Sequence, residues 1–245
     1  MLRARASAKR TKTPAPWDRA ARAVHPPRDN ALSRPPEASV SMPGLSMAGL
    51  SITVSRGHDF FTEGKLATEV FRLVSGSARL VKLMNDGRRQ ICEFIMPGDF
   101  LGLVNQDEPQ CSAEALEECV ALRFPRAGID ARIAADAEFA GDIRRRAAKG
   151  LNNAYERMVF LCHRSATARV AWFLLTTPLQ AAPGAPDTFH LPMTRSDIGD
   201  YLGMALETAS RAFTQLKRAG AILEPDTHLI TIADRPRLKN IADNG

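Results

Sequence analysis

Residues 191–220 constrain the fold of this chain most, because they carry the start, the buried face and the end of two consecutive short helices. Thr194 and Asp197 have the spacing of a capping box, which begins a helix, and Gly203 ends it. A second helix is predicted from about Leu206 to Gly220, so the segment predicts a helix-turn-helix. The apolar positions expected to face inward are Ile198, Tyr201 and Leu202 in the first helix, and Ala209, Ala212, Phe213 and Leu216 in the second.

The opposite face of the second predicted helix carries polar side chains that suit a DNA major groove. Arg211 can donate to the O6 and N7 atoms of guanine, and Glu207 can accept from the N4 amine of cytosine. The alternative is an ordinary surface ion pair between Glu207 and Arg211, because an acidic and a basic side chain four residues apart form such pairs on helices of many proteins. The outward positions are Glu207, Ser210, Arg211, Thr214 and Arg218.

The net charge does not by itself indicate nucleic-acid binding. The 245-residue chain has a formal charge of +6, but residues 1–41 contain nine Lys or Arg against three Asp or Glu. The rest of the chain is therefore neutral, and phosphate contacts depend on local placement of cations. The local candidates are Arg195, Arg211, Lys217 and Arg218.

Residues 1–44 are rich in Arg, Lys and Pro and lack a sustained apolar period, so we expect a disordered tail. A start codon placed too early and an arm that touches DNA are the alternatives. The segment has the charge of an organelle transit peptide but is broken by prolines and lacks the apolar core of a secretion signal. No run of 18 apolar residues occurs, so the expected protein is soluble and cytoplasmic, without a membrane partner.

Residues 45–135 are predicted to form a small antiparallel roll or barrel, because short apolar segments alternate with turn residues. Turns are expected at residues 75–76, 85–87 and 97–99. A barrel of this size can enclose one small ligand. The predicted strands are residues 70–73, 77–84, 89–96 and 113–124.

Residues 136–164 are predicted to form one long helix. Its apolar residues recur at steps of four and three, which is typical of a seam shared with a second helix. Packing of this helix on its own roll is the alternative. The seam residues are Ile143, Ala147, Leu151, Ala154, Met158 and Leu161.

The helix-turn-helix segment resembles the DNA-binding end of the Crp/Fnr superfamily, whose form is close to TRxDIGxYLGxxxETxSRxxxxLxxxG. It is most similar to the FixK-like branch, which places a Leu before the Glu, as Leu206 and Glu207 do here. The matching residues are Thr194, Arg195, Asp197, Ile198, Gly199, Tyr201, Leu202, Gly203, Glu207, Thr208, Ser210, Arg211, Leu216 and Gly220.

The resemblance implies a homodimeric transcription regulator, either an activator or a repressor, that binds double-stranded DNA and RNA polymerase. The long helix would join the two copies and set their reading helices one DNA turn, roughly 34 Å, apart. The implied target is a palindrome of the type TTGAT-N4-ATCAA. By residue match, Leu206, Glu207, Ser210 and Arg211 would contact bases, and Arg195 and Thr208 would contact phosphates. Two departures, Ala205 and Ala209, remove a possible cap and a larger apolar side chain.

The roll also carries motifs that resemble cyclic nucleotide-binding domains, at residues 72–78 and 97–102. In nucleotide-binding relatives a Glu and an Arg hold the ligand, but Leu103 and Cys111 stand at those positions here. A buried phosphate without its guanidinium would face an apolar wall, so we expect the roll to work without cyclic nucleotide. Gating by an unidentified small ligand in the roll is the alternative.

The four cysteines, Cys92, Cys111, Cys119 and Cys162, are scattered and lack the paired spacing of a cluster or metal site. They are expected to be small apolar residues in a reducing compartment. Cys111 and Cys162 are the candidates for a redox thiol, because each is predicted near a loop or a helix end. Cys162 and His163 together allow a haem or metal ligand, but no second ligand is indicated. We therefore expect no cofactor and no metal.

The expected fold class is α+β, with a tail (1–44), a double-stranded β-roll (45–135), a dimerisation helix (136–164) and a winged helix-turn-helix (165–245). Segments 222–223 and 229–232 would form the hairpin of the wing. The sequence contains no catalytic nucleophile motif, carboxylate pair or Gly-rich phosphate loop, so it does not predict an enzyme.

Overall fold

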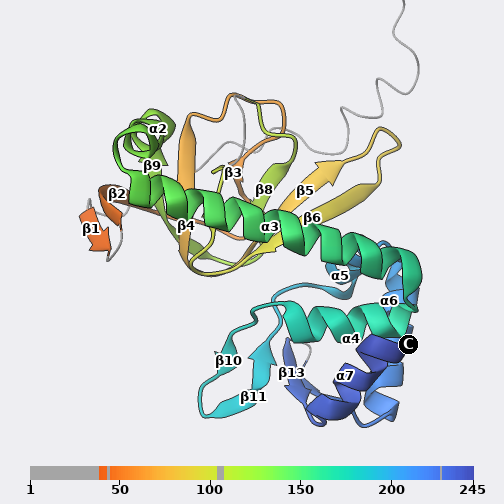
Figure 1. The fold of residues 1–245 in the computed structure, drawn as a ribbon. Helices are drawn as coiled ribbons and strands as arrows, with labels where there is room; N and C mark the ends of the chain where they lie inside the picture. The colour runs from red at the N-terminus through yellow and green to blue at the C-terminus, as the bar shows by residue number, and fades with distance from the viewer. Residues whose placement is uncertain (1–38, 43–44, 104–107, 227) are drawn as a thin grey trace, which may run out of the picture.

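The computed structural model describes residues 39–42, 45–103, 108–226 and 228–245. The long helix α3 (Ala137–His163) runs along a β-roll and ends at a second, mixed domain, as Figure 1 shows. Among the described residues, no helix is long and apolar enough to cross a membrane. The mixed α+β architecture is the one that the sequence predicts.

The roll consists of two antiparallel sheets, ordered β1-β2-β9-β4-β7 and β3-β8-β5-β6. Buried apolar side chains of both sheets, including Phe60, Phe71 and Leu73, fill the space between them. The strands are β1 (Ser39–Met42), β2 (Leu45–Val54), β3 (Asp59–Phe61), β4 (Glu69–Ser75), β5 (Ala78–Leu83), β6 (Arg89–Ile95), β7 (Phe100–Leu101), β8 (Ser112–Ala115) and β9 (Cys119–Pro125).

Three features of the roll differ from the sequence prediction. The single strand expected at residues 113–124 is two strands, because β8 and β9 belong to different sheets and the chain crosses between them at residues 116–118. Ser39–Met42 pair with β2, so the tail boundary expected at residue 44 is too late. Helix α2 (Arg126–Ala135) was not predicted. The rest of the expected tail, residues 1–38 and 43–44, lies outside the described part of the chain.

The predicted long helix is confirmed, but two of its six predicted seam residues pack within their own chain. Asp136 caps α3 by accepting a hydrogen bond from the Phe139 amide at 3.0 Å. Ile143 packs on the apolar cluster of the roll, and Leu161 packs on the core of the second domain. The side chains that stay exposed at helical spacing are Leu151, Tyr155, Met158 and Val159, each more than half exposed.

In the described residues, the second domain packs two helices and a four-stranded sheet around the two helices of the helix-turn-helix. The sheet order is β10-β11-β13-β12, and the predicted wing corresponds to β12 and β13. The elements are α4 (Ala166–Thr176), β10 (Ala181–Ala182), β11 (Ala185–His190), α5 (Arg195–Leu202), α6 (Leu206–Arg218), β12 (Ile222–Asp226), β13 (Leu229–Ile232) and α7 (Arg235–Asn244).

Candidate DNA-binding site

Helix α5 begins and ends where the sequence predicts. The Thr194 amide donates to Asp197 Oδ2 at 2.9 Å, and the Asp197 amide donates to Thr194 Oγ1 at 3.1 Å, which completes a capping box. Gly203 ends the helix with φ +63°, a left-handed conformation that favours glycine. A Cβ on Gly199 would lie 2.7 Å from the Met204 carbonyl oxygen, so the tight turn into α6 requires glycine there as well.

The capping carboxylate of α5 also binds the roll. The Asp197 side chain is 3% exposed and contacts two arginines of the β5–β6 hairpin, Arg79 and Arg89. Arg89 Nη2 lies 2.8 Å from Asp197 Oδ1 and 2.6 Å from Asp200 Oδ2, while Arg79 Nη2 lies 2.9 Å from Glu114 Oε2. Sequence reasoning missed both arginines, because they precede α5 by more than a hundred residues.

Aromatic and cationic contacts complete this junction. The Tyr201 ring lies 4.9 Å from the Phe94 ring of β6, between ring centroids. On the other side, the Arg157 guanidinium of α3 lies 4.8 Å from the Tyr201 centroid and donates to the Cys92 carbonyl of β6. Helix α5 is thus held by the roll, by α3 and by its own domain.

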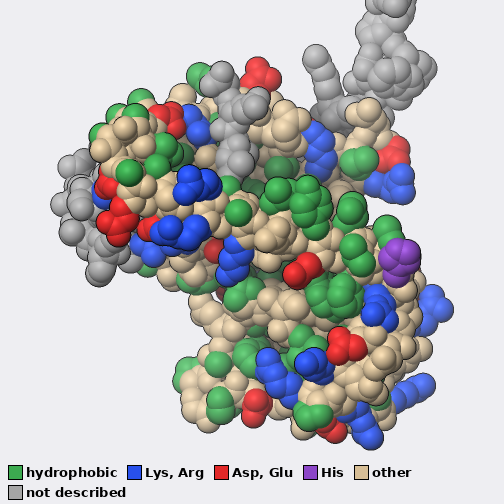
Figure 2. Space-filling model, in the orientation of Figure 1, with side chains coloured by type: hydrophobic (Ala, Val, Ile, Leu, Met, Phe, Trp, Pro, Cys, Tyr) green, Lys and Arg blue, Asp and Glu red, His purple; other side chains and the backbone are tan. Residues whose placement is uncertain are grey.

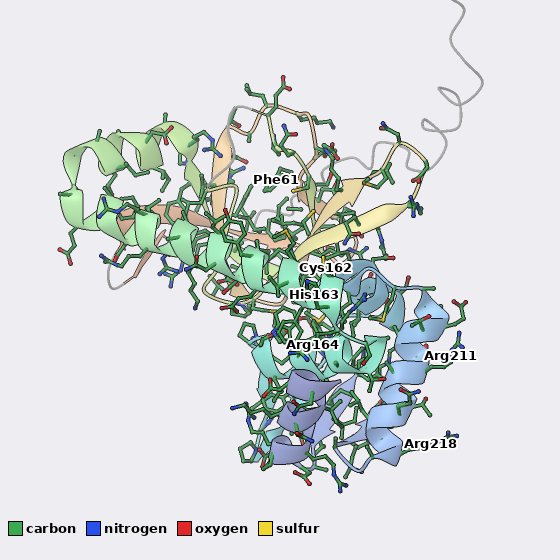
Figure 3. All side chains as sticks on the ribbon, turned by 45° about the vertical axis from the view of Figure 1, so that its right-hand side comes forward. Phe61, Cys162, His163, Arg164, Arg211 and Arg218 are labelled. Atoms are coloured by element: carbon green, nitrogen blue, oxygen red, sulfur yellow. The ribbon has the colours of Figure 1, made fainter. Side chains whose placement is uncertain are left out.

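Helix α6 buries the predicted stripe of Ala209, Ala212, Phe213 and Leu216. Its opposite face is open, and Figure 3 shows Arg211 and Arg218 projecting from the outer edge of the domain. Among the outward residues, Glu207 and Thr214 are exposed and Ser210 is half-buried. The helix therefore presents the predicted reading face to solvent. The other predicted contact residues are Leu206, which is exposed, and Thr208, which is half-buried.

Glu207 and Arg211 do not form the surface ion pair that was the alternative to DNA reading. Arg211 Nε donates to the backbone carbonyl of Glu207 at 3.3 Å, and within the described residues no ion pair joins the two side chains. The N-cap residue Ala205 makes no side-chain hydrogen bond to the helix. Both charged groups are thus available to a ligand in front of α6.

Arg195 differs from the other predicted DNA contacts, because it is already bound within the protein. Its guanidinium lies 3.5 Å from the centroid of the Phe213 ring and pairs with the Glu224 carboxylate of β12. Lys217 Nζ binds the other oxygen of that carboxylate at 2.6 Å. Burial lowers the pKa of Arg195, and the Glu224 charge opposes this effect. Sequence reasoning missed Glu224, since it stands on a strand remote from α5 in the chain.

The four cysteines are free, and the structure brings two of them, Cys92 and Cys111, together. Cys111 contacts Cys92, whereas Cys162 is exposed at the end of α3 (Figure 3). The hydrogen bond between the two thiols, against the opposing effect of burial, lowers the pKa of Cys92 to about 7, and the same bond and burial raise the pKa of Cys111. Cys119 is buried, and burial raises its pKa to about 12.

The region that holds cyclic nucleotide in the resembling domains is apolar at Leu103. This side chain packs with the cluster of Val70, Phe124 and Phe139 beneath α3. In the described part of the chain, no group of three or more His, Cys, Asp or Glu residues has the arrangement of a metal site.

Comparison with known proteins agrees with this architecture in both domains. Residues 168–241 match the Crp-like helix-turn-helix domain, and residues 51–136 match the cyclic nucleotide-binding domain. The nitrogen fixation regulation protein FixK of Bradyrhizobium diazoefficiens is 41% identical over 176 residues, which are 71% of this chain and 74% of that protein. The transcriptional activatory protein AadR of Rhodopseudomonas palustris is 38% identical over 165 residues, 66% of this chain and 69% of that protein.

A solved structure of FixK2 from Bradyrhizobium japonicum has the same fold. It superposes with a TM-score of 0.75 at 33% identity and covers 80% of this chain and 98% of that one. The relatives are transcription regulators and not enzymes. Both domains match, and the identity to FixK extends over most of the chain. The protein therefore belongs to the FixK branch of the Crp/Fnr family of DNA-binding transcription regulators.

Proposed function

We propose that this regulator binds a TTGAT-N4-ATCAA-like palindrome as a homodimer. The observation that carries the proposal is the open face of α6, on which the Glu207 and Arg211 side chains have no ion-pair partner in the described chain. Glu207, Ser210 and Arg211 would hydrogen-bond to base edges, and Leu206 would contact a thymine methyl group. Thr208 and Arg195 would contact phosphates.

The apolar surface of α3 supports the homodimer. Leu151, Tyr155, Met158 and Val159 are between 53% and 56% exposed, and Figure 2 shows hydrophobic side chains gathered over the C-terminal half of this helix. An exposed apolar row at helical spacing on a long helix is stabilised when a second helix covers it. Pairing two copies along α3 would also present two reading helices to the two halves of a palindrome.

The mode of action is proposed from the relatives and from the roll. One relative is named as an activatory protein, so we propose that this protein activates transcription in the cytoplasm by contacting RNA polymerase. Leu103 packs in an apolar cluster, and Cys111 replaces the arginine of nucleotide-binding relatives. These two positions support action without cyclic nucleotide.

The test is a titration of the full chain against the palindrome and a scrambled duplex at fixed salt. Arg211→Ala should weaken binding to the palindrome by about 1–3 kcal/mol and relax the choice at one base pair, because a bidentate guanine contact is lost. Arg218→Ala, on the same exposed side of α6, is the matched control and should weaken both duplexes equally. Equal loss on both duplexes for Arg211→Ala would remove its base-reading role.

A second candidate function, gating by thiol oxidation, is favoured by the contact between Cys92 and Cys111. The pKa of Cys92, lowered to about 7 by the Cys111 hydrogen bond against burial, predicts a thiolate that forms near neutral pH. Alkylation of Cys92 should therefore rise with a midpoint near pH 7, while Cys119 stays unreactive. Mass spectrometry of the alkylated chain measures this, and Cys111→Ala, which removes the hydrogen-bond donor, should move the midpoint upward. If peroxide treatment leaves palindrome binding unchanged, redox gating is wrong.

A further inference from the structure

We propose that Glu224 competes with the DNA backbone: its carboxylate occupies Arg195 and Lys217 beside the reading helix and so weakens binding to DNA of any sequence. This inference rests on the proposed DNA-binding function. A residue of the wing would thus oppose DNA binding electrostatically, whereas the base-reading residues favour it.

The three charged groups come from three different elements of the domain. Arg195 is the first residue of α5, Lys217 lies in the last turn of α6, and Glu224 lies in β12. The carboxylate divides its oxygens between the cations, since Oε1 pairs with Arg195 and Oε2 lies 2.6 Å from Lys217 Nζ. One carboxylate thus screens two cationic side chains, and the three residues together keep a net charge of one positive unit.

Arg195 and Lys217 are exposed enough to exchange the Glu224 carboxylate for a DNA phosphate. The exposed fraction of the side chain is 42% for Lys217, 20% for Arg195 and 18% for Glu224. Glu224 is the single hydrogen-bond acceptor of the Arg195 guanidinium among the described residues, so the other N–H groups of this guanidinium remain unused. The Phe213 ring beneath the guanidinium holds it in place during such an exchange.

The carboxylate is held in its ionised form, which the competition requires. Burial raises the pKa of Glu224, but hydrogen bonds and charges of Lys217 and Arg195 outweigh it and keep the pKa below its usual value. At neutral pH a phosphate that approaches either cation therefore meets a fixed negative charge. Since backbone contacts carry the part of binding that is independent of sequence, this charge lowers affinity for specific and random DNA alike.

The experiment measures the affinity of the full chain for the palindrome and for the scrambled duplex over a range of salt concentrations. Glu224→Gln keeps the shape of the side chain and removes its charge. We expect binding to both duplexes to tighten by roughly threefold to tenfold at about 0.1 M salt. The plot of log K against log salt should become steeper by about 0.9 for each subunit, because one more phosphate is neutralised.

Two further variants keep the result interpretable. Lys217→Gln retains the pair of Arg195 with Glu224 and should weaken both duplexes, with a slope shallower by about 0.9 for each subunit. Asp187→Asn removes one negative charge from the exposed side of β11, in the same sheet, and should change neither affinity nor slope beyond error. A thermal unfolding curve of each variant shows whether it is folded.

The outcomes separate this inference from the proposed function. If folded Glu224→Gln binds both duplexes no more tightly than the wild type, or more weakly, Glu224 merely positions Arg195 and the competition is overturned. If Asp187→Asn tightens binding as much as Glu224→Gln, net charge explains the effect and the inference also fails. The proposed function fails on a different measurement: the wild-type chain would bind the palindrome no more tightly than the scrambled duplex.

Discussion

The two helices of the helix-turn-helix are held in opposite ways. Helix α5 has a complete capping box, and its carboxylates Asp197 and Asp200 bind arginines of the roll. Helix α6 has no side-chain cap at Ala205, and it is held by its buried stripe and by polar contacts near its C-terminal end, including the pair of Lys217 with Glu224. Within the described residues, the side-chain contacts with arginines of the roll are thus made by α5 and none by α6.

This difference explains how the reading face stays available. A cation that is already paired with a carboxylate within the protein attracts a phosphate less strongly, as we propose for Arg195 with Glu224. Arg211 and Glu207 have no such partner to lose in the described chain. Fixing α5 positions α6 without using its outward groups. The following changes test this division of roles.

The largest expected effect is at Asp197. Asp197→Ala removes half of the capping box and leaves the guanidinium groups of Arg79 and Arg89 with fewer carboxylates, so the free energy of unfolding should fall by about 3 kcal/mol. Urea unfolding followed by circular dichroism measures this. Asp187→Ala, on an exposed strand position, is the control and should change it by less than about 0.5 kcal/mol. A loss at Asp197 as small as at the control would mean that α5 needs no support from the roll.

An intermediate effect is expected at Arg89. Arg89→Ala leaves Asp197 bound to Arg79 but strips Asp200 of its partner, so we expect a loss of about 1–2 kcal/mol in the same unfolding measurement. Its neighbour Arg88 offers a matched control. Arg88 is 82% exposed and pairs with the exposed Asp86, so Arg88→Ala should have little effect. Equal effects of the two substitutions would contradict the importance of the contact between the roll and α5.

The smallest effect is a gain at α6. Ala205→Ser supplies the missing N-cap hydroxyl, which should stabilise the helix by about 0.5–1 kcal/mol. Ala219→Ser at the opposite end of α6 tests whether the gain is specific to the cap, because a hydroxyl there meets no free helix N–H group. Thermal unfolding should show a raised midpoint for the first variant alone. If both variants shift the midpoint alike, the gain does not come from a cap, and the contrast between the capped start of α5 and the uncapped start of α6 is wrong.

The long helix shows where prediction from sequence stops. Its approximate bounds follow from the apolar period, and the structure adds the Asp136 cap, which that period does not reveal. Of the predicted seam residues, Ile143 and Leu161 pack on the two domains of their own chain, whereas Leu151 and Met158 stay exposed. Helical periodicity identifies apolar positions, but it does not say which partner covers each one.

The sequence by itself determined both helices of the helix-turn-helix, the capping box of the first, the buried stripe of the second and the family. Caps and stripes depend on residues within one or two helical turns, so spacing alone reveals them. The tertiary structure decided that Asp197 binds Arg79 and Arg89, and that Arg195 and Lys217 share Glu224. Charged side chains select partners by distance in the folded chain, and the order of residues in the sequence does not contain that distance.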